Sequence, residues 1–280
     1  MKQKKQNFDC LLKKAEQGDS EAQFDVAFCY EHGEGVAYNY EEALKWYKLS
    51  SEQGNEYSQF RLGLFHHYGF YVMKNDKEAA KWFKISAEQG NSSAQSYLGL
   101  CYYYGSGVTQ NYKEAFKWTK MSAEQENEDG QFLLGELYFY GRGIKRNAEE
   151  AISWIRKSAM QGNPEAQYKL FECYLYGRGT EKNIEEAKKW FEACHSDWIG
   201  FPWDDEKSAA KWFRKLAKQG DHQAQYHLGL CYLLGYGVDK NVEEAVKWLE
   251  KAAKEEYADA QEELDDITNN QSLSSYDNNR

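Results

Sequence analysis

Tryptophan recurs at a fixed spacing along this 280-residue chain. Seven of its nine tryptophans lie 36 residues apart, except for one step of 22 residues after Trp190. A fixed period of this length is typical of a solenoid, in which each repeat buries its apolar face only by stacking on its neighbours. The seven residues are Trp46, Trp82, Trp118, Trp154, Trp190, Trp212 and Trp248.

Each repeat is predicted to contain two helices, helix A and helix B, and both begin at a polar cap. An Asp or Asn directly after the repeat glycine (a glutamate in one repeat) predicts the N-cap of helix A. An Asn with Glu three residues later has the spacing of a capping box and predicts the start of helix B. The helix A caps are Asp19, Asn55, Asn91, Asn127, Asn163 and Asp221, and the helix B caps are Asn39, Asn75, Asn111, Asn147, Asn183 and Asn241.

Small and large residues alternate on the faces that are predicted to pack. An alanine three residues before each regularly spaced tryptophan of the full repeats suggests an interlocking face of helix B, with the tryptophans in the core. A small residue on helix A would allow a neighbouring helix to approach closely, although Phe171 breaks this pattern. A glutamine recurs on the same face of helix A, and we expect its amide to bridge backbone groups between repeats, because buried amides need partners. The small residues are Ala27, Gly63, Gly99, Gly135 and Gly229, and the glutamines are Gln23, Gln59, Gln95, Gln131, Gln167, Gln225 and Gln261.

The net charge and the lack of long apolar stretches restrict the kinds of molecule that this chain is expected to bind. The net charge of −10 argues against a nucleic acid or an anionic membrane as the main ligand, because both need a basic surface. No stretch has the apolar length of a signal peptide core or a membrane span, so we expect a cytoplasmic protein that is monomeric by itself and binds another protein. Four cysteines share one repeat position and are interpreted as small core residues: Cys29, Cys101, Cys173 and Cys231.

The repeat resembles the Sel-one-like repeat family, relatives of the tetratricopeptide repeat. The third repeat shows the matching residues: Gly90, Asn91, Ala94, Gln95, Leu98, Gly99, Tyr102, Gly105, Gly107, Val108, Asn111, Glu114, Ala115, Trp118, Ala123 and Gln125. The resemblance implies an all-α fold, a right-handed superhelical solenoid of paired antiparallel helices. It also implies a non-enzymatic adaptor or scaffold that assembles other proteins. In the second repeat Tyr71 replaces the second loop glycine, so a remodelled hairpin is expected there.

The domain prediction follows the repeat. A capping helix at 1–17 precedes six repeats within 18–267, and residues 256–267 form a closing half-repeat. Residues 268–280 are polar and asparagine-rich and are predicted to be disordered. The repeats are 18–53, 54–89, 90–125, 126–161, 162–219 and 220–255, the fifth with an irregular insertion near 193–208.

The irregular insertion is rich in aromatic residues. It holds Trp198, Phe201 and Trp203, including the only two tryptophans outside the repeat position. These side chains either fill the gap left by a missing helix A or anchor a partner protein, and the sequence leaves both interpretations open.

A partner-binding stripe is predicted on the variable face of helix A. By resemblance to paired-helix solenoids this face lines the concave side, and its aromatic and basic residues are of the kinds that protein interfaces favour. The alternative is that its tyrosines merely pack against the next repeat. The stripe residues are Tyr57, Arg61, Leu64, Tyr68, Tyr97, Leu100, Tyr104, Leu133, Tyr140, Lys169 and Tyr176.

Few residues suggest chemistry. The spacing of Ser208 and Lys211 matches that of penicillin-recognising enzymes, which makes an amide or lactam hydrolase the rival function, but the companion motifs are missing. The histidines show no metal-ligand spacing, and no phosphate loop appears. We therefore predict no catalytic residues, no metal and no cofactor.

Overall fold

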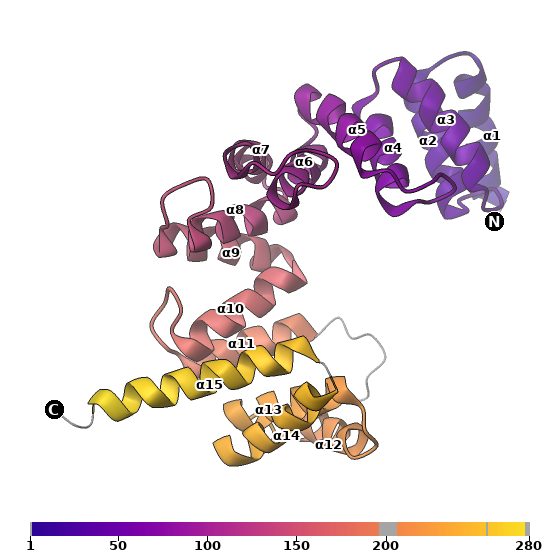
Figure 1. Cartoon of the computed structure of the whole chain (residues 1–280). Helices are drawn as coiled ribbons and strands as arrows, with labels where there is room; N and C mark the ends of the chain where they lie inside the picture. Colours follow the sequence, from indigo (N-terminus) through magenta and orange to yellow (C-terminus); the bar gives the residue numbers. More distant parts are fainter. Residues whose placement is uncertain (1, 196–205, 256, 278–280) are drawn as a thin grey trace. The chain divides into compact units, whose positions relative to one another are not determined.

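A computed structural model describes residues 2–195, 206–255 and 257–277. The chain divides into two compact units, Met1–Ala166 (unit 1) and Gln167–Arg280 (unit 2). The described residues form fifteen α-helices and no strand, which confirms the predicted all-α class of paired antiparallel helices (Figure 1). The helices are α1 (Lys2–Glu16), α2 (Ser20–His32), α3 (Tyr40–Glu52), α4 (Glu56–Tyr68), α5 (Asp76–Gln89), α6 (Ser92–Tyr104), α7 (Tyr112–Glu124), α8 (Glu128–Tyr140), α9 (Ala148–Gln161), α10 (Pro164–Tyr176), α11 (Ile184–His195), α12 (Glu206–Ala217), α13 (His222–Leu234), α14 (Val242–Lys254) and α15 (Ala258–Asp277).

The predicted caps start the helices, although the capping box forms only in part. Asn39 Oδ1 accepts a hydrogen bond from the backbone N–H of Glu42 at 3.1 Å, as an N-cap should. The backbone N–H of Asn39 donates instead to the carbonyl of Tyr30, so it is not left for the Glu42 side chain. The Glu42 carboxylate accepts from Lys45 at 2.7 Å. The same backbone bond ties the start of each helix B to the preceding helix A in all six full repeats.

The residue that follows each regularly spaced tryptophan of helix B is more deeply buried than that tryptophan. This corrects the prediction that all of these tryptophans are core residues. Ala43 and Tyr47 are fully buried, whereas Trp46 between them is only half-buried. Residues four apart share one helix face, and a neighbour of either is turned by about 100°. Trp118 and Trp190 are buried; the other five tryptophans at the repeat position are half-buried. Lysine ammonium groups cover some of these rings, as Lys157 does 3.9 Å from the ring centre of Trp154.

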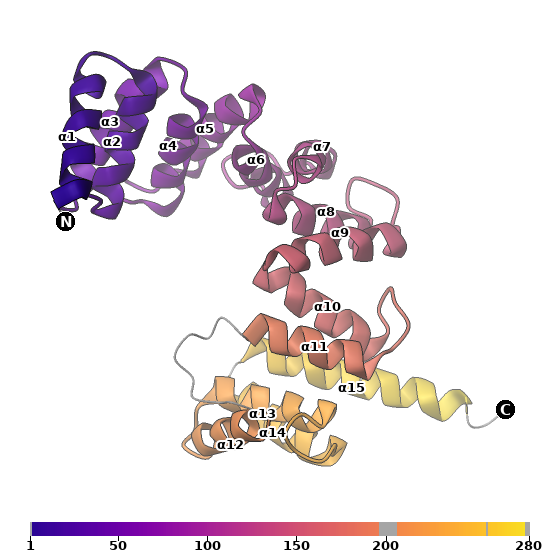
Figure 2. The ribbon, with the colours of Figure 1, turned by 180° about the vertical axis from the view of Figure 1, so that it is seen from behind.

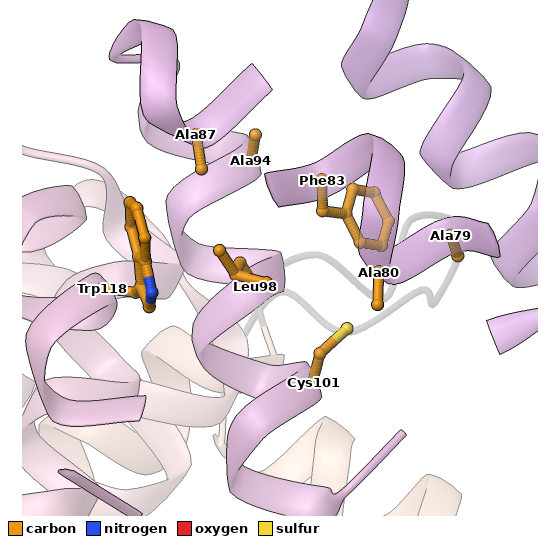
Figure 3. Close-up of a cluster of buried hydrophobic side chains, with 8 residues drawn as sticks. All are labelled: Ala79, Ala80, Phe83, Ala87, Ala94, Leu98, Cys101 and Trp118. Atoms are coloured by element: carbon orange, nitrogen blue, oxygen red, sulfur yellow. The ribbon is translucent and has the colours of Figure 1, made fainter. Parts of the chain in front are cut away.

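Successive helices of unit 1 enclose one apolar cluster after another. Figure 3 shows Leu98 of α6 between Phe83 of α5 and Trp118 of α7. Gly99 lies beside α7, where a Cβ atom would collide with Thr119 Oγ1. The prediction that small residues let the helices approach closely is therefore confirmed. In unit 2, Phe171 takes the small residue's place and packs on Phe191 with ring centroids 5.4 Å apart.

The repeated glutamine joins repeats as predicted at Gln23, Gln59, Gln95 and Gln225, whereas Gln261 donates to Asp265 within α15. Gln95 Nε2 donates to the carbonyl of Ala87 in the preceding repeat at 3.1 Å. A serine adds a second bond, which was not predicted: Ser122 Oγ donates to the carbonyl of Ser92, the first residue of helix α6, at 2.7 Å. The two bonds fix each helix pair internally and against the preceding one.

The C-terminal segment differs from the prediction. Helix α15 continues from Ala258 to Asp277, so residues 268–277 are helical where disorder was expected. No glycine or proline interrupts this segment, and Ile267 is buried directly before it. In both views α15 lies beside α11 (Figures 1 and 2).

Candidate functional site

An open pocket of about 460 Å³ lies on unit 1, lined by residues of α4, α6, α8 and the start of α10. Several helices contribute to it because residues 36 apart in the sequence come to equivalent places on successive A helices. Its walls are mostly aromatic and its rim carries carboxylates. The lining residues are His67, Tyr68, Tyr97, Leu100, Cys101, Tyr103, Tyr104, Ser106, Asp129, Phe132, Leu133, Glu136, Asn163 and Glu165.

Five residues of the predicted stripe meet in this pocket: Tyr68, Tyr97, Leu100, Tyr104 and Leu133. The hydroxyls of Tyr68 and Tyr97 are 3.1 Å apart and share a hydrogen bond. Tyr68 remains 52% exposed and Tyr104 69% exposed, so packing against the next repeat does not bury these rings. The structure thus brings together the middle of the predicted stripe and leaves its tyrosines accessible.

Other stripe residues of unit 1 lie outside the pocket. Arg61 forms an ion pair with Glu31, and Tyr47 donates to the same carboxylate at 2.6 Å, so Arg61 belongs to the framework of the repeat. Leu64 packs against the core cluster of α5 and α6. Tyr57 faces Phe24, with ring centroids 5.8 Å apart, and Arg142 covers the ring of Tyr140 at 5.1 Å.

The two stripe residues of unit 2 have partners within that unit. Lys169 pairs with Glu172 at 3.4 Å. The hydroxyl of Tyr176 donates to the carboxyl of Glu263 on α15, and Arg178 pairs with Asp266 on the same helix. The chain's own C-terminal helix therefore covers the part of the stripe around Tyr176.

The carboxylates of the pocket are absent from the predicted stripe, although the repeat period contains a signal for them. Asp129 and Glu165 stand 36 residues apart in the position of Tyr57, and Glu136 stands in the position of Leu64 and Leu100. Both positions lie on the variable face of helix A, from which the predicted stripe takes only aromatic, apolar and basic residues. Along the repeats, the position of Tyr57 becomes acidic at Asp129 on α8 and at Glu165 on α10, and this change is readable from the sequence.

Neighbouring charges act on Asp129. It keeps contact with solvent at the rim and accepts a hydrogen bond from Asn163 Nδ2 at 3.1 Å. Partial burial raises the pKa of its carboxyl above the usual range, the negative charge of Glu165 raises it further, and the bond from Asn163 opposes both effects. Asp129, Glu136 and Glu165 thus bring three carboxyl groups to the pocket, and none of the residues that line it in the described chain is lysine or arginine, although the guanidinium of Arg142 lies over the ring of the lining residue Tyr103.

Groups suited to metal binding are not assembled in the part of the chain that the structure describes. No three His, Cys, Asp or Glu side chains gather there as a metal ion would require. Ser208 and Lys211 both belong to α12, and the Ser208 side chain lies outside the described residues. Cys101 is buried as predicted, and burial raises the pKa of its thiol to about 12, which disfavours the reactive thiolate.

Two further points concern membranes and the insertion. Across residues 2–195, 206–255 and 257–277, no helix combines the length and apolarity that a bilayer crossing would require. Trp198, Phe201 and Trp203 lie outside the described residues, so the choice between a structural plug and a partner anchor stays as the sequence left it.

Comparison of the sequence with family models gives a match to the Sel1 repeat over most of the chain. Two shorter matches cover the stretch that we expected as one irregular fifth repeat. The matched residues are 20–55, 56–91, 92–127, 128–163, 164–193, 198–221 and 222–257.

Two solved structures are similar over nearly the whole chain. A Sel1 repeat protein from Oxalobacter formigenes is 31% identical with a TM-score of 0.69, and the match covers 90% of this chain and 92% of that protein. A protective antigen present in uropathogenic Escherichia coli strains, displaying an SLR fold, is 36% identical with a TM-score of 0.68. That match covers 94% of this chain and 60% of the antigen.

Curated relatives match over short stretches only. The DAP3-binding cell death enhancer 1 of Rattus norvegicus is 45% identical over 65 residues, which are 23% of this chain and 13% of that protein. The chitin synthase regulator SKT5 of Saccharomyces cerevisiae is 46% identical over 52 residues, which are 19% of this chain and 8% of the regulator. The chain thus spans a small fraction of the length of these relatives.

Proposed function

The chain belongs to the Sel1 repeat family, and on this premise we propose that it acts as a scaffold that binds a partner protein through the tyrosine pocket of unit 1. The binding surface comprises the five stripe residues that meet there, and the chain contributes no covalent chemistry of its own. A segment of the partner, extended or helical, occupies the pocket and the helix A surface beside it.

The observation that carries this proposal is the exposure of tyrosine rings around a concave surface. Tyr68 and Tyr104 keep at least half of their surface in water although the fold offers neighbouring apolar side chains. Aromatic side chains supply much of the binding free energy in protein interfaces, because they bury a large area at a small cost in conformational entropy. The names of the curated relatives, one that binds DAP3 and one that regulates chitin synthase, fit the same class of function.

The test compares matched tyrosine variants in affinity capture from the native host. Tyr97→Ala with Tyr104→Ala removes two pocket rings, whereas Tyr38→Ala removes a ring that is 64% exposed in a loop away from the pocket. We expect the pocket variant to lose specific partners that the wild type and the Tyr38 variant retain. Arg61 is left unchanged in these variants, because its replacement would break the ion pair with Glu31 and disturb folding.

The stability of each variant decides how a loss of capture is interpreted. Tyr97 is half-buried and packs on Phe60 and Phe83, so its removal has a structural cost that thermal unfolding must measure. Tyr104→Ala alone is the milder variant, because its ring is largely in water. Retained capture by both folded variants would contradict the proposal.

A further inference from the structure

The pocket of unit 1 has a chemistry that restricts which partner side chain it can hold. This inference rests on the proposed function, because it concerns the occupant of the same pocket. The walls present the rings of Tyr97, Tyr104 and Phe132, and the rim presents the carboxylates of Asp129 and Glu165. A purely apolar side chain would leave those carboxylates facing it without compensation, and an acidic one would be repelled.

The two rim carboxylates lack a cationic partner of their own. Among the described residues neither Asp129 nor Glu165 forms an ion pair with a lysine or arginine, and Asp129 is held only by the neutral amide of Asn163. Burial, and after it the negative charge of Glu165, raises the pKa of Asp129, as expected for two nearby carboxylates that repel one another. An incoming positive charge would relieve this repulsion, and because no three-ligand cluster occurs among the described residues, an organic cation fits this role better than a metal ion.

The chain shows how tyrosines and carboxylates hold a guanidinium group. The guanidinium of Arg142 lies over the rings of Tyr103, Tyr112 and Tyr140, at 5.0, 5.5 and 5.1 Å from their centres. Arg61 Nε donates to Glu31 at 3.1 Å, and Tyr47 donates to the same oxygen. A guanidinium stacks on aromatic faces and binds carboxylates through a planar set of donors, whereas an ammonium is a strongly hydrated point charge.

We propose that this pocket is an anchor site for an arginine side chain of the partner protein, with its charge held by Asp129 and Glu165 and its planar group packed on the tyrosine rings. The volume of about 460 Å³ suits one long side chain with parts of its neighbours. The partner segment therefore carries an arginine flanked by residues that are small or apolar.

The probe is a displayed library of random short peptides, selected on the wild-type full-length chain. The tightest binder is synthesised with its arginine kept, replaced by lysine, or replaced by citrulline, which has nearly the same shape without the charge. We expect arginine to be enriched. The citrulline peptide should bind roughly tenfold more weakly, about the contribution of one charge-assisted hydrogen bond, and the lysine peptide should also lose affinity.

Protein variants supply the matched comparison. Asp129→Asn with Glu165→Gln removes the two rim charges, and Glu124→Gln with Glu149→Gln removes two exposed charges on B helices. The first pair should weaken the arginine peptide by about tenfold and leave the citrulline peptide unchanged, and the second pair should alter neither affinity. The difference between the peptides also guards against a folding defect, which would weaken both.

The possible failures are distinguishable. Selected peptides that lack arginine but need Tyr97 and Tyr104 would overturn the arginine site and leave the proposed function intact. Equal affinity for the lysine peptide, or full affinity in the Asp129 and Glu165 variant, would also overturn it. If no peptide is selected, or none depends on Tyr97 and Tyr104, both the arginine site and the proposed function fail.

Discussion

The side-chain amide of Gln125 donates a hydrogen bond to Gln95 Oε1 at 2.8 Å. Gln95 lies on α6, and Gln125 directly follows α7. Because Gln95 also donates to the carbonyl of Ala87, one buried amide joins its own helix pair to the preceding repeat. Gln53 and Gln23 form the corresponding bond in the first repeat, as do Gln161 and Gln131 in the fourth.

Replacing this glutamine should therefore loosen the stack. We expect Gln95→Ala to lower the free energy of unfolding by about 1–3 kcal/mol, because it leaves a buried carbonyl without its donor. Urea unfolding followed by circular dichroism measures the change. Gln6→Ala, at an exposed position of α1, is the control and should have almost no effect. Equal stability of the two variants would show that water replaces the lost bonds at no cost.

The close approach of α6 and α7 gives a second prediction. Gly99→Ala should cost about 1–3 kcal/mol of stability, because the added methyl group collides with Thr119 Oγ1. Thr119→Ala removes the colliding atom, so the double variant should recover part of the loss, with a coupling energy of about 0.5–3 kcal/mol. Strict additivity of the two changes, measured by chemical denaturation, would rule out the collision as the cause.

The second repeat offers a substitution that should stabilise the chain. Tyr71 has a φ of 55°, in the left-handed region, where the corresponding residues Gly35 and Gly107 have φ of 75° and 73°. A non-glycine residue in this region costs about 1–2 kcal/mol. We expect Tyr71→Gly to raise the melting temperature and Tyr71→Ala, which keeps a Cβ atom, to give no such gain. A lower melting temperature for Tyr71→Gly would mean that the stacking of Tyr71 on Tyr40, at 5.0 Å, outweighs the strain.

The sequence was sufficient to predict what every repeat shares. Caps such as Asn39 and the glycine contact at Gly99 follow from local rules applied to a constant position. The sequence was less informative at positions where the residue type varies from repeat to repeat. The residue after each tryptophan is more deeply buried than the tryptophan itself, yet it ranges from Tyr47 to Thr119, so its role became visible only in the packed helices.

The candidate site could be predicted only in part, for a related reason. The repeat position shared by Tyr68 and Tyr104 was identified from its spacing. Which repeat positions of neighbouring helices together enclose a pocket depends on how the helices pack. Asp129 and Glu165 reach the pocket from the first turns of later A helices, which no single-helix pattern indicates. Nor did charge alone reveal that Arg61 is engaged by Glu31.

The charge of the pocket predicts a coupling between its carboxyl groups. Carbon-13 NMR of Asp129 should give a pKa above the usual value of about 3.9, because burial and the charge of Glu165 favour the protonated form. Glu165→Gln should lower this pKa by removing the neighbouring charge, and Asn163→Ala should raise it by removing the hydrogen bond. An unchanged pKa in the Glu165 variant would mean that the two groups do not interact.

The C-terminal helix of unit 2 gives a prediction about pH. Glu263 is only 2% exposed and accepts a hydrogen bond from Tyr176. Burial raises the pKa of its carboxyl well above the usual range, and the charges of Glu172 and Asp266 raise it further. An acid with a raised pKa in the folded state contributes stability that is complete below its unfolded pKa and is lost as the pH rises through the folded value.

Glu263→Gln should therefore stabilise unit 2 at neutral and alkaline pH, because glutamine carries no charge to be desolvated and its carbonyl can still accept from Tyr176. We expect a gain of about 1 kcal/mol or more and a melting temperature that depends less on pH than that of the wild type. Glu262→Gln, at the exposed neighbouring position, removes the same charge without burial and should leave the wild-type dependence in place. The Glu262 and Glu263 variants could instead give the same melting curve at every pH. That result would mean that ionisation of the buried Glu263 carboxyl costs no stability, and it would contradict the prediction.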